Sequence, residues 1–148
     1  ARFVTVIDGG WDHHEKIRDA MKGKLLSVDQ GLATLVRDLE RRGLLERTLV
    51  IMVTEFGRTA KINKDGGRDH WPKAFSVALA GGGVKAGTIF GQTDPRGAEP
   101  ARDPVSPEDL ATTVYNQLGI DASRELMSPG NRPLEIVKDG SVLYDILA

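Results

Sequence analysis

Histidine and aspartate side chains occur together at two places in the sequence. The three histidines are His13, His14 and His70, and Asp12 and Asp69 lie next to the first and the last of them. Imidazole nitrogen and carboxylate oxygen together suit zinc and other divalent first-row metals. Asp12 and His14 have the Asp-x-His spacing that can supply two ligands to one ion, and a third ligand from a distant loop would leave a position open for water or substrate. The spacing alone is as typical of exposed polar residues or of a local hydrogen bond as it is of a metal site.

A glutamate and an arginine lie close together after the most apolar stretch of the chain. Glu55 follows that stretch directly, where a metal-binding carboxylate is expected, and Arg58 comes three residues later. The planar guanidinium group of Arg58 matches the geometry of phosphate or sulfate. A surface salt bridge between Glu55 and Arg58 is the alternative, and the segment taken alone favours it. Arg68, in the second histidine-containing loop, has the same two interpretations.

Apolar runs predict the strands that lead into these loops. The predicted strands are residues 3–7, 48–54, 75–80 and, as a short fourth strand, 87–91. Residues 48–54 are apolar nearly throughout, as is typical of a parallel strand that is covered on both faces. The three glycines at 81–83 lack the Lys-Ser/Thr pair of a phosphate-binding P-loop and therefore predict a tight turn.

Two helices are predicted from apolar spacing and capping residues. Residues 28–39 carry apolar side chains at helical spacing, and Gly43 is the expected stop. The second helix begins after Ser106, with proline at its first position and acids in its first turn, and ends near Gly119. The remaining segments are expected to be irregular at 92–106 and 121–134, and a hairpin or a strand with a short helix at 134–147.

Strands that alternate with helices predict an α/β fold. In α/β sheets, functional residues gather on loops at the carboxyl ends of strands. This rule selects residues 8–15 and 55–70, the two segments that contain the histidines, Glu55 and Arg58. We therefore expect the two loops to lie close together.

The composition fits one globular domain that spans all 148 residues, with 40% hydrophobic and 28% charged residues. A net charge of -1 without long runs of one sign argues against nucleic acid as a partner. The chain has no cysteine, so thiolate metal sites and disulfides are excluded. Because the sequence starts inside a strand-like run without an initiator methionine, we expect a fragment or a processed product.

Three motifs in order resemble a known bacterial family. They are Gly-Gly-Trp-Asp-x-His at 9–14, Glu-Phe-Gly-Arg-Thr at 55–59 and Gly-Arg-Asp-His-Trp-Pro at 67–72. The chain is similar to the family called domain of unknown function 1501, which is often labelled sulfatase-like and is placed in the alkaline phosphatase superfamily. The likeness runs from Phe3 to Leu147, and residues 105–120 resemble the late helix of that superfamily. The resemblance implies a layered α/β/α fold with a mainly parallel sheet, present here as an incomplete, C-terminal portion of the full domain.

The resemblance also implies a set of metal ligands. One divalent ion, zinc first and manganese, calcium or magnesium as alternatives, would be held by Asp12, His14 and His70. Glu55 would belong to a second site, but Phe56 stands where the family's superfamily has histidine, so that site is incomplete. Asp69 would be a further ligand or would hold His70. An arginine balances the charge of the substrate in this superfamily, and Arg58 matches that role, with Arg68 as the second choice.

The function implied by the resemblance is hydrolysis of a small-molecule phosphate or sulfate ester by an activated hydroxyl group. The superfamily's nucleophile lies upstream of the matching region, so we expect this chain to be catalytically incomplete and to need the upstream half of its parent protein. A non-catalytic binding or structural module and a phosphomutase-like transferase are the alternatives. An exposed sheet edge would promote self-association. The resemblance points to an exported bacterial protein, with the cytoplasm as the alternative.

Overall fold

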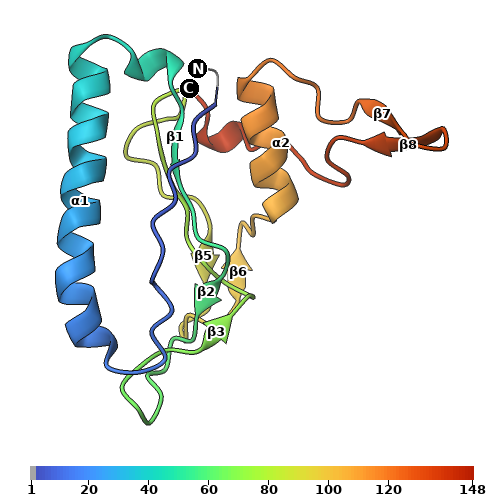
Figure 1. Cartoon of the computed structure of the whole chain (residues 1–148). Coiled ribbons are helices and arrows are strands. Elements are labelled where there is room, and N and C mark those ends of the chain that lie inside the picture. The colour runs from blue at the N-terminus through green and yellow to red at the C-terminus, as the bar shows by residue number, and fades with distance from the viewer. Residues whose placement is uncertain (1–2) are drawn as a thin grey trace.

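The computed structural model describes residues 3–148, which form two α-helices, two short 3₁₀ helices and eight short strands (Figure 1). The helices are α1 (Ile17–Arg41), α2 (Pro107–Gln117), η1 (Leu45–Arg47) and η2 (Tyr144–Ile146). The strands are β1 (Val50–Met52), β2 (Gly57–Arg58), β3 (His70–Trp71), β4 (Ala78–Ala80), β5 (Gln92–Thr93), β6 (Pro100–Arg102), β7 (Glu125–Ser128) and β8 (Arg132–Glu135). Neither α-helix in the described part is long and apolar enough to cross a membrane.

The predicted α/β/α fold with a mainly parallel sheet is wrong. The strands form four separate antiparallel pairs: β1 with β4, β2 with β3, β5 with β6, and β7 with β8. Parallel neighbours require a crossover connection, usually a helix. The segment between β1 and β4 contains the β2–β3 pair and loops but no helix, so the chain returns beside β1 in the opposite direction, with Val50 opposite Ala80. An apolar run predicts that a strand forms, but it does not predict the direction of its neighbour.

Two of the predicted strands are absent from the described residues. Residues 3–7 are not part of any strand, and Phe3, Val4, Val6 and Ile7 are 73% to 88% exposed. Residues 87–91 form a turn and an irregular segment instead of a strand, and the next strand, β5, begins at Gln92. In both segments no helix or sheet packs over the apolar side chains. Because β propensity reflects packing on a half-buried surface, these residues do not form a strand.

The helix predicted at residues 28–39 is confirmed, but it begins earlier. In α1 the apolar spacing already starts with Ile17, Met21 and Leu25, which precede the predicted stretch at intervals of four residues. Lysines and a glycine between these positions obscured the pattern. The predicted stop is confirmed: α1 ends at Arg41, and Gly43 adopts a positive φ of 64° that favours glycine.

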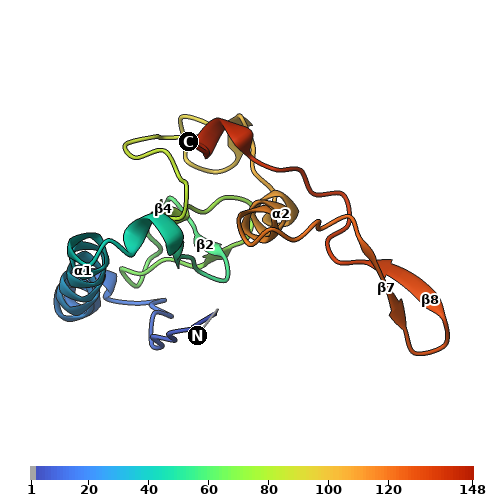
Figure 2. The same cartoon turned by 90° about the horizontal axis from the view of Figure 1, so that it is seen from above.

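The apolar stretch 48–54 is covered on one side by α1. Seen from above, α1 lies to one side of β4 (Figure 2). Leu32 and Val36 of α1 line an apolar depression together with Val50 and Met52 of β1 and with β4. The accessible surface of the chain is 11325 Å², whereas a compact monomer of this mass exposes about 7,400 Å². The expected coverage of this strand on both faces is therefore wrong, since Met52 remains about half exposed.

The helix predicted after Ser106 is confirmed as α2, and its first two turns also bind the C-terminal segment. Ser106 accepts a hydrogen bond from the backbone N–H of Asp109, and Asp109 accepts one from the backbone N–H of Ser106, which is a capping box. The other carboxylate oxygen of Asp109 accepts a hydrogen bond from the backbone N–H of Ser141 at 2.9 Å. Thr113 accepts one from the backbone N–H of Leu143. These bonds tie the segment before η2 to α2.

We expect Asp109→Ala to lower the free energy of unfolding by about 1–2 kcal/mol, because it removes the carboxylate half of the capping box and the bond from Ser141. The hydrogen bonds from Ser106 lower the pKa of Asp109. A carboxyl group with a lowered pKa in the folded state stabilises the protein above its ordinary pKa and loses that contribution as the pH falls. The difference between the two proteins should therefore shrink below about pH 4. Urea unfolding at several pH values measures it, with Glu108→Ala as the matched first-turn control.

The segment predicted to be irregular at 121–134 contains most of a β-hairpin, so that prediction is wrong. β7 and β8 pair from Glu125 opposite Glu135 to Ser128 opposite Arg132. The turn between them includes Gly130 and Asn131, both with positive φ, which is the turn chemistry that the prediction overlooked. The hairpin projects away from α2 (Figure 1). Of the two alternatives for 134–147, a strand followed by a short helix describes β8 and η2 better than a hairpin does.

Candidate metal centre

One group of backbone hydrogen bonds shapes the second histidine-containing loop, and another group joins that loop to the first one. In the β2–β3 pair, Arg58 lies directly opposite His70. The loop before α1 runs beside the loop at 65–68. The backbone N–H of Arg68 donates to the backbone carbonyl of His13 at 3.1 Å, and the backbone N–H of Lys16 donates to the backbone carbonyl of Asp65 at 3.1 Å. The prediction that residues 8–15 and 55–70 lie close together is confirmed, although antiparallel pairs rather than a parallel sheet achieve it.

This approach of the two loops requires a residue without a side chain at position 67. A Cβ atom on Gly67 would lie 2.0 Å from the carbonyl carbon of His14 and 2.3 Å from the nitrogen of Glu15. Both neighbours are backbone atoms, so no side-chain rotation could relieve the overlap. Gly57 has a similar constraint in β2, where an added Cβ would lie 1.9 Å from the carbonyl oxygen of Ala74. Gly67 thus determines how closely the two loops approach each other, and Gly57 determines how closely β2 approaches the segment after β3.

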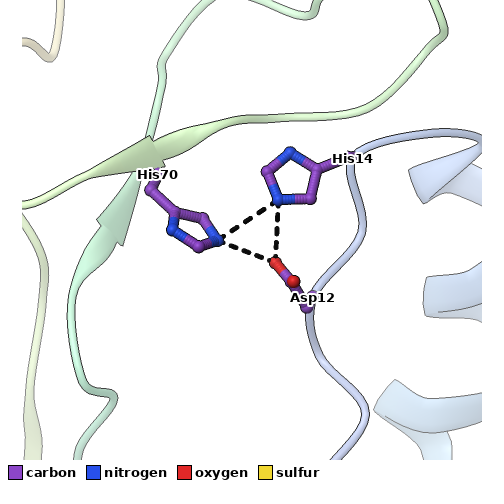
Figure 3. A group of neighbouring side chains, drawn as sticks. All are labelled: Asp12, His14 and His70. Carbon is purple, nitrogen blue, oxygen red and sulfur yellow. Dashed lines mark hydrogen bonds and ion pairs between the residues drawn. The ribbon is translucent and has the colours of Figure 1, made fainter.

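Three side chains from these loops converge on one point (Figure 3). Asp12 Oδ1 lies 2.9 Å from His70 Nε2 and 3.1 Å from His14 Nε2. The two Nε2 atoms lie 3.2 Å apart. Among residues 3–148, this is the group of His, Asp and Glu side chains whose donor atoms are close enough to share one ion. The three residues are those that the family resemblance implied for a single metal.

The donor set and its spacing fit a zinc ion. Zinc bonds of about 2.0–2.1 Å in tetrahedral geometry place neighbouring ligand atoms about 3.3 Å apart. The three separations in the group, 2.9, 3.1 and 3.2 Å, are close to that value. The side chains are accessible, with 63% exposure for Asp12 and 47% for each histidine. A fourth position is therefore open to solvent.

Asp12 is surrounded by groups that favour its charged form. The Arg58 Nη2 atom lies 2.6 Å from Asp12 Oδ1, and Arg58 Nη1 donates to the carbonyl of Arg68 at 3.2 Å. The hydrogen bond with His70, followed by the one from Arg58 and by the charge of His14, lowers the pKa of Asp12 well below its ordinary range. Asp12 is thus a carboxylate at neutral pH, as a metal ligand must be.

The other predicted site residues lie outside the group of three. Asp69 Oδ1 lies 2.8 Å from the Nδ1 atom of His14, on the far side of that ring from the other donors. Glu55 is exposed and does not join the three donors. The buried Nε2 atom of His13 has no hydrogen-bond partner in the described part of the chain, and His13 meets the other loop through its carbonyl group. Metal binding by Glu55 or Asp69 stays a prediction.

Two residues that position the group were not predicted. Phe56 packs against the His70 ring, with 4.3 Å between the ring centres. Asn63 donates to Asp69 at 3.2 Å and to the carbonyl of His14 at 2.9 Å. In the sequence, Phe56 signals only that the second metal site lacks its histidine, because a ring contact with His70 depends on the tertiary structure. Asn63 lies in a polar loop between Ile62 and Lys64, and no local pattern distinguishes it from a solvated residue.

Comparison with known proteins identifies one family. A family model described as "Protein of unknown function (DUF1501)" matches residues 1–147. No curated protein and no solved structure matches the chain.

Proposed function

The chain belongs to DUF1501, a family of proteins of unknown function, and we propose that it binds one divalent metal ion through Asp12, His14 and His70. We further propose that zinc is the preferred ion and that the site hydrolyses a small-molecule phosphate or sulfate ester, with Arg58 binding its oxyanion. The observation that carries the proposal is the convergence of three donor atoms from loops more than 50 residues apart.

The choice of zinc rests on the kinds of donor atom. Two imidazole nitrogens and one carboxylate suit zinc and its first-row neighbours. Calcium and magnesium prefer sites made of oxygen atoms, so the two histidines favour zinc over them. Manganese also prefers oxygen ligands, so the two histidines favour zinc over manganese as well.

The proposed chemistry follows from the position of Arg58 next to the three donors. A bound divalent ion polarises an ester oxygen and lowers the pKa of a coordinated water molecule. The guanidinium group of Arg58, 2.6 Å from Asp12 Oδ1, is within reach of an oxyanion at the open side of the site. The N–H groups of Arg58 that are not bonded to Asp12 or to the Arg68 carbonyl can donate to an oxygen of a phosphate or sulfate group. Asp12 and the carbonyl of Arg68 hold the guanidinium group in that place.

A metal-holding module without catalytic activity is the second candidate function. It is favoured by the position of Glu55, which lies outside the group of three donors, so that the described residues offer one ion site rather than two. Two-metal hydrolases use ions about 3.5–4 Å apart to hold both the attacking and the leaving oxygen. A chain with one site would bind an oxyanion and turn esters over slowly or not at all.

Metal content tests the proposed binding directly. After incubation with excess zinc and gel filtration, elemental mass spectrometry should find close to one zinc per chain, because the donors converge on a single point. Zinc-loaded protein is then assayed with 4-nitrophenyl phosphate and 4-nitrophenyl sulfate. Turnover of either ester supports the hydrolase, and stoichiometric zinc without turnover supports the binding module. A chain that retains no zinc would contradict both.

Replacement of Arg58 should weaken oxyanion binding more than metal binding. We expect Arg58→Ala to raise the dissociation constant of inorganic phosphate for the zinc-loaded chain about tenfold or more, since a charged hydrogen bond contributes roughly 1.5–3 kcal/mol. Isothermal titration with phosphate and with sulfate measures this change. Arg96→Ala is the control, because Arg96 is an exposed arginine that pairs with Asp94 outside the site. Equal phosphate affinity in the two variants would contradict the proposed role of Arg58 in oxyanion binding.

A further inference from the structure

The second ring nitrogen of His14 has a partner of its own. Nδ1 lies 2.8 Å from Asp69 Oδ1, and the same ring presents Nε2 to Asp12 and His70. An ionised carboxylate accepts hydrogen bonds and cannot donate them. Asp69 is the closer of the two carboxylates around the ring, at 2.8 Å from Nδ1 against 3.1 Å for Asp12 Oδ1 from Nε2, and Asp12 already pairs with Arg58. The proton of a neutral His14 is therefore favoured at Nδ1, which leaves the Nε2 lone pair facing the other donors. In metal sites, this pairing of a carboxylate with the distal nitrogen of a histidine orients the ring toward the ion.

The carboxylate of Asp69 is itself held in place. Asn63 Nδ2 donates to Asp69 Oδ1 at 3.2 Å and to the His14 carbonyl at 2.9 Å. The Asn63 side-chain oxygen accepts from the backbone N–H groups of Gly67 and Asp65, at 2.9 and 3.1 Å. Because backbone N–H groups can only donate, they determine which end of the Asn63 amide is the oxygen and direct its NH₂ group to Asp69. His14 and Asn63 thus approach the same carboxylate oxygen of Asp69, which they hold in one orientation.

We propose that Asp69, oriented by Asn63, is a positioning residue that fixes His14 as an Nε2 ligand and is not itself a ligand; this inference rests on the proposed metal site. The alternatives for Asp69 were direct metal binding or a hydrogen bond to His70. Its carboxylate lies at Nδ1 of His14 instead, outside the group formed by Asp12, His14 and His70. His70 has no comparable partner at its own Nδ1 among the described residues, so the support is specific to His14.

Histidine nitrogen shifts test the inference in the metal-free protein. Long-range ¹H–¹⁵N correlation spectra at about pH 8.5, where an ordinary imidazole is neutral, distinguish a protonated Nδ1 from a protonated Nε2. We expect His14 to carry its proton at Nδ1 in the wild type and to shift toward Nε2 in Asp69→Ala. Asp65→Ala is the matched control: Asp65 lies in the same loop, is as exposed as Asp69 (53% and 54%), and its carboxylate pairs with Lys64.

Zinc affinity in the same variants provides a second readout. We expect Asp69→Ala to lower zinc affinity about 10- to 100-fold while one zinc still binds, as for other residues that support a metal-bound histidine. Asp69→Asn keeps a carbonyl oxygen next to Nδ1 and should restore part of the loss, and Asp65→Ala should match the wild type. A loss with Asp69→Ala as large as with Asp12→Ala would overturn the inference in favour of a ligand role.

The two measurements separate this inference from the proposed function. A wild-type chain that binds no zinc would contradict the proposed function, while the nitrogen shifts would still decide whether Asp69 holds His14. A wild-type chain that binds zinc, with His14 nitrogen shifts unchanged in Asp69→Ala, would contradict the positioning role and leave the metal site standing.

Discussion

His70→Ala is expected to lower the zinc affinity of the chain about 100- to 1,000-fold. Structural zinc sites with four protein ligands bind their ion with roughly 10–16 kcal/mol, so one ligand contributes roughly 2.5–4 kcal/mol. Asp12→Ala should have an effect of the same size, since Asp12 Oδ1 lies within about hydrogen-bonding distance of both histidines, 2.9 and 3.1 Å from their Nε2 atoms. Competition with a chromogenic zinc chelator measures the affinity of each variant.

The matched control for His70→Ala is His13→Gln. His13 is the neighbour of His14 in the chain, but it does not belong to the group of three donors. Glutamine keeps a polar group near the buried position of the His13 Nε2 atom. Circular dichroism of the metal-free proteins shows whether each variant keeps its helices. Equal zinc affinity in His70→Ala and the wild type, with both folded, would exclude the proposed site.

Gly67→Ala is expected to reduce zinc affinity as strongly as the loss of a ligand, although residue 67 has no side chain to offer an ion. The added methyl group would overlap the backbone of His14 and Glu15, at 2.0 to 2.3 Å. The two loops would have to separate, which breaks the hydrogen bond from Arg68 to the carbonyl of His13. His14 would then move away from His70. Overpacking of this kind typically costs about 1–3 kcal/mol of stability, so the thermal midpoint should fall together with zinc affinity.

Gly23→Ala is the control for the effect of an added methyl group. Gly23 lies within α1, and nothing lies within 4 Å of the Cβ atom that alanine would add. Alanine in a helix is favoured over glycine by about 0.5–1 kcal/mol. We therefore expect Gly23→Ala to bind zinc like the wild type and to be slightly more stable. Normal zinc affinity in Gly67→Ala would show that the site does not depend on the close approach of the two loops.

The parts of the fold that were predicted correctly depend on residues near each other in the chain. The central turns of α1 follow from apolar spacing, and its end follows from Gly43. The start of α2 follows from Ser106, the proline after it and the acids of its first turn. The turn at 81–83 follows from three glycines, all with positive φ. Helical turns, caps and tight turns are made by hydrogen bonds within a few residues, so their signals are complete in a short segment.

The sheet could not be predicted in the same way, because a strand obtains its partner from a distant part of the chain. Residues 48–54 and 3–7 have similar apolar runs, yet the first contains β1 and the second forms no strand. The difference lies in β4, which pairs with β1, and in α1, whose Leu32 and Val36 lie against that pair. Pairing and burial are decided by what lies opposite a strand, which its own residues do not encode.

For the candidate site, the sequence by itself determined which donor atoms are available: with no cysteine and three histidines, a metal has to be held by imidazole and carboxylate groups. The Asp-x-His spacing also determined that Asp12 and His14 could share one ion. The tertiary structure decided which distant residues join them, because the antiparallel β2–β3 pair and the glycine at 67 place His70 next to His14. It also decided the partner of Asp69. Neighbouring side chains on an extended backbone point to opposite sides, so Asp69 and His70 contact different nitrogens of the His14 ring rather than each other.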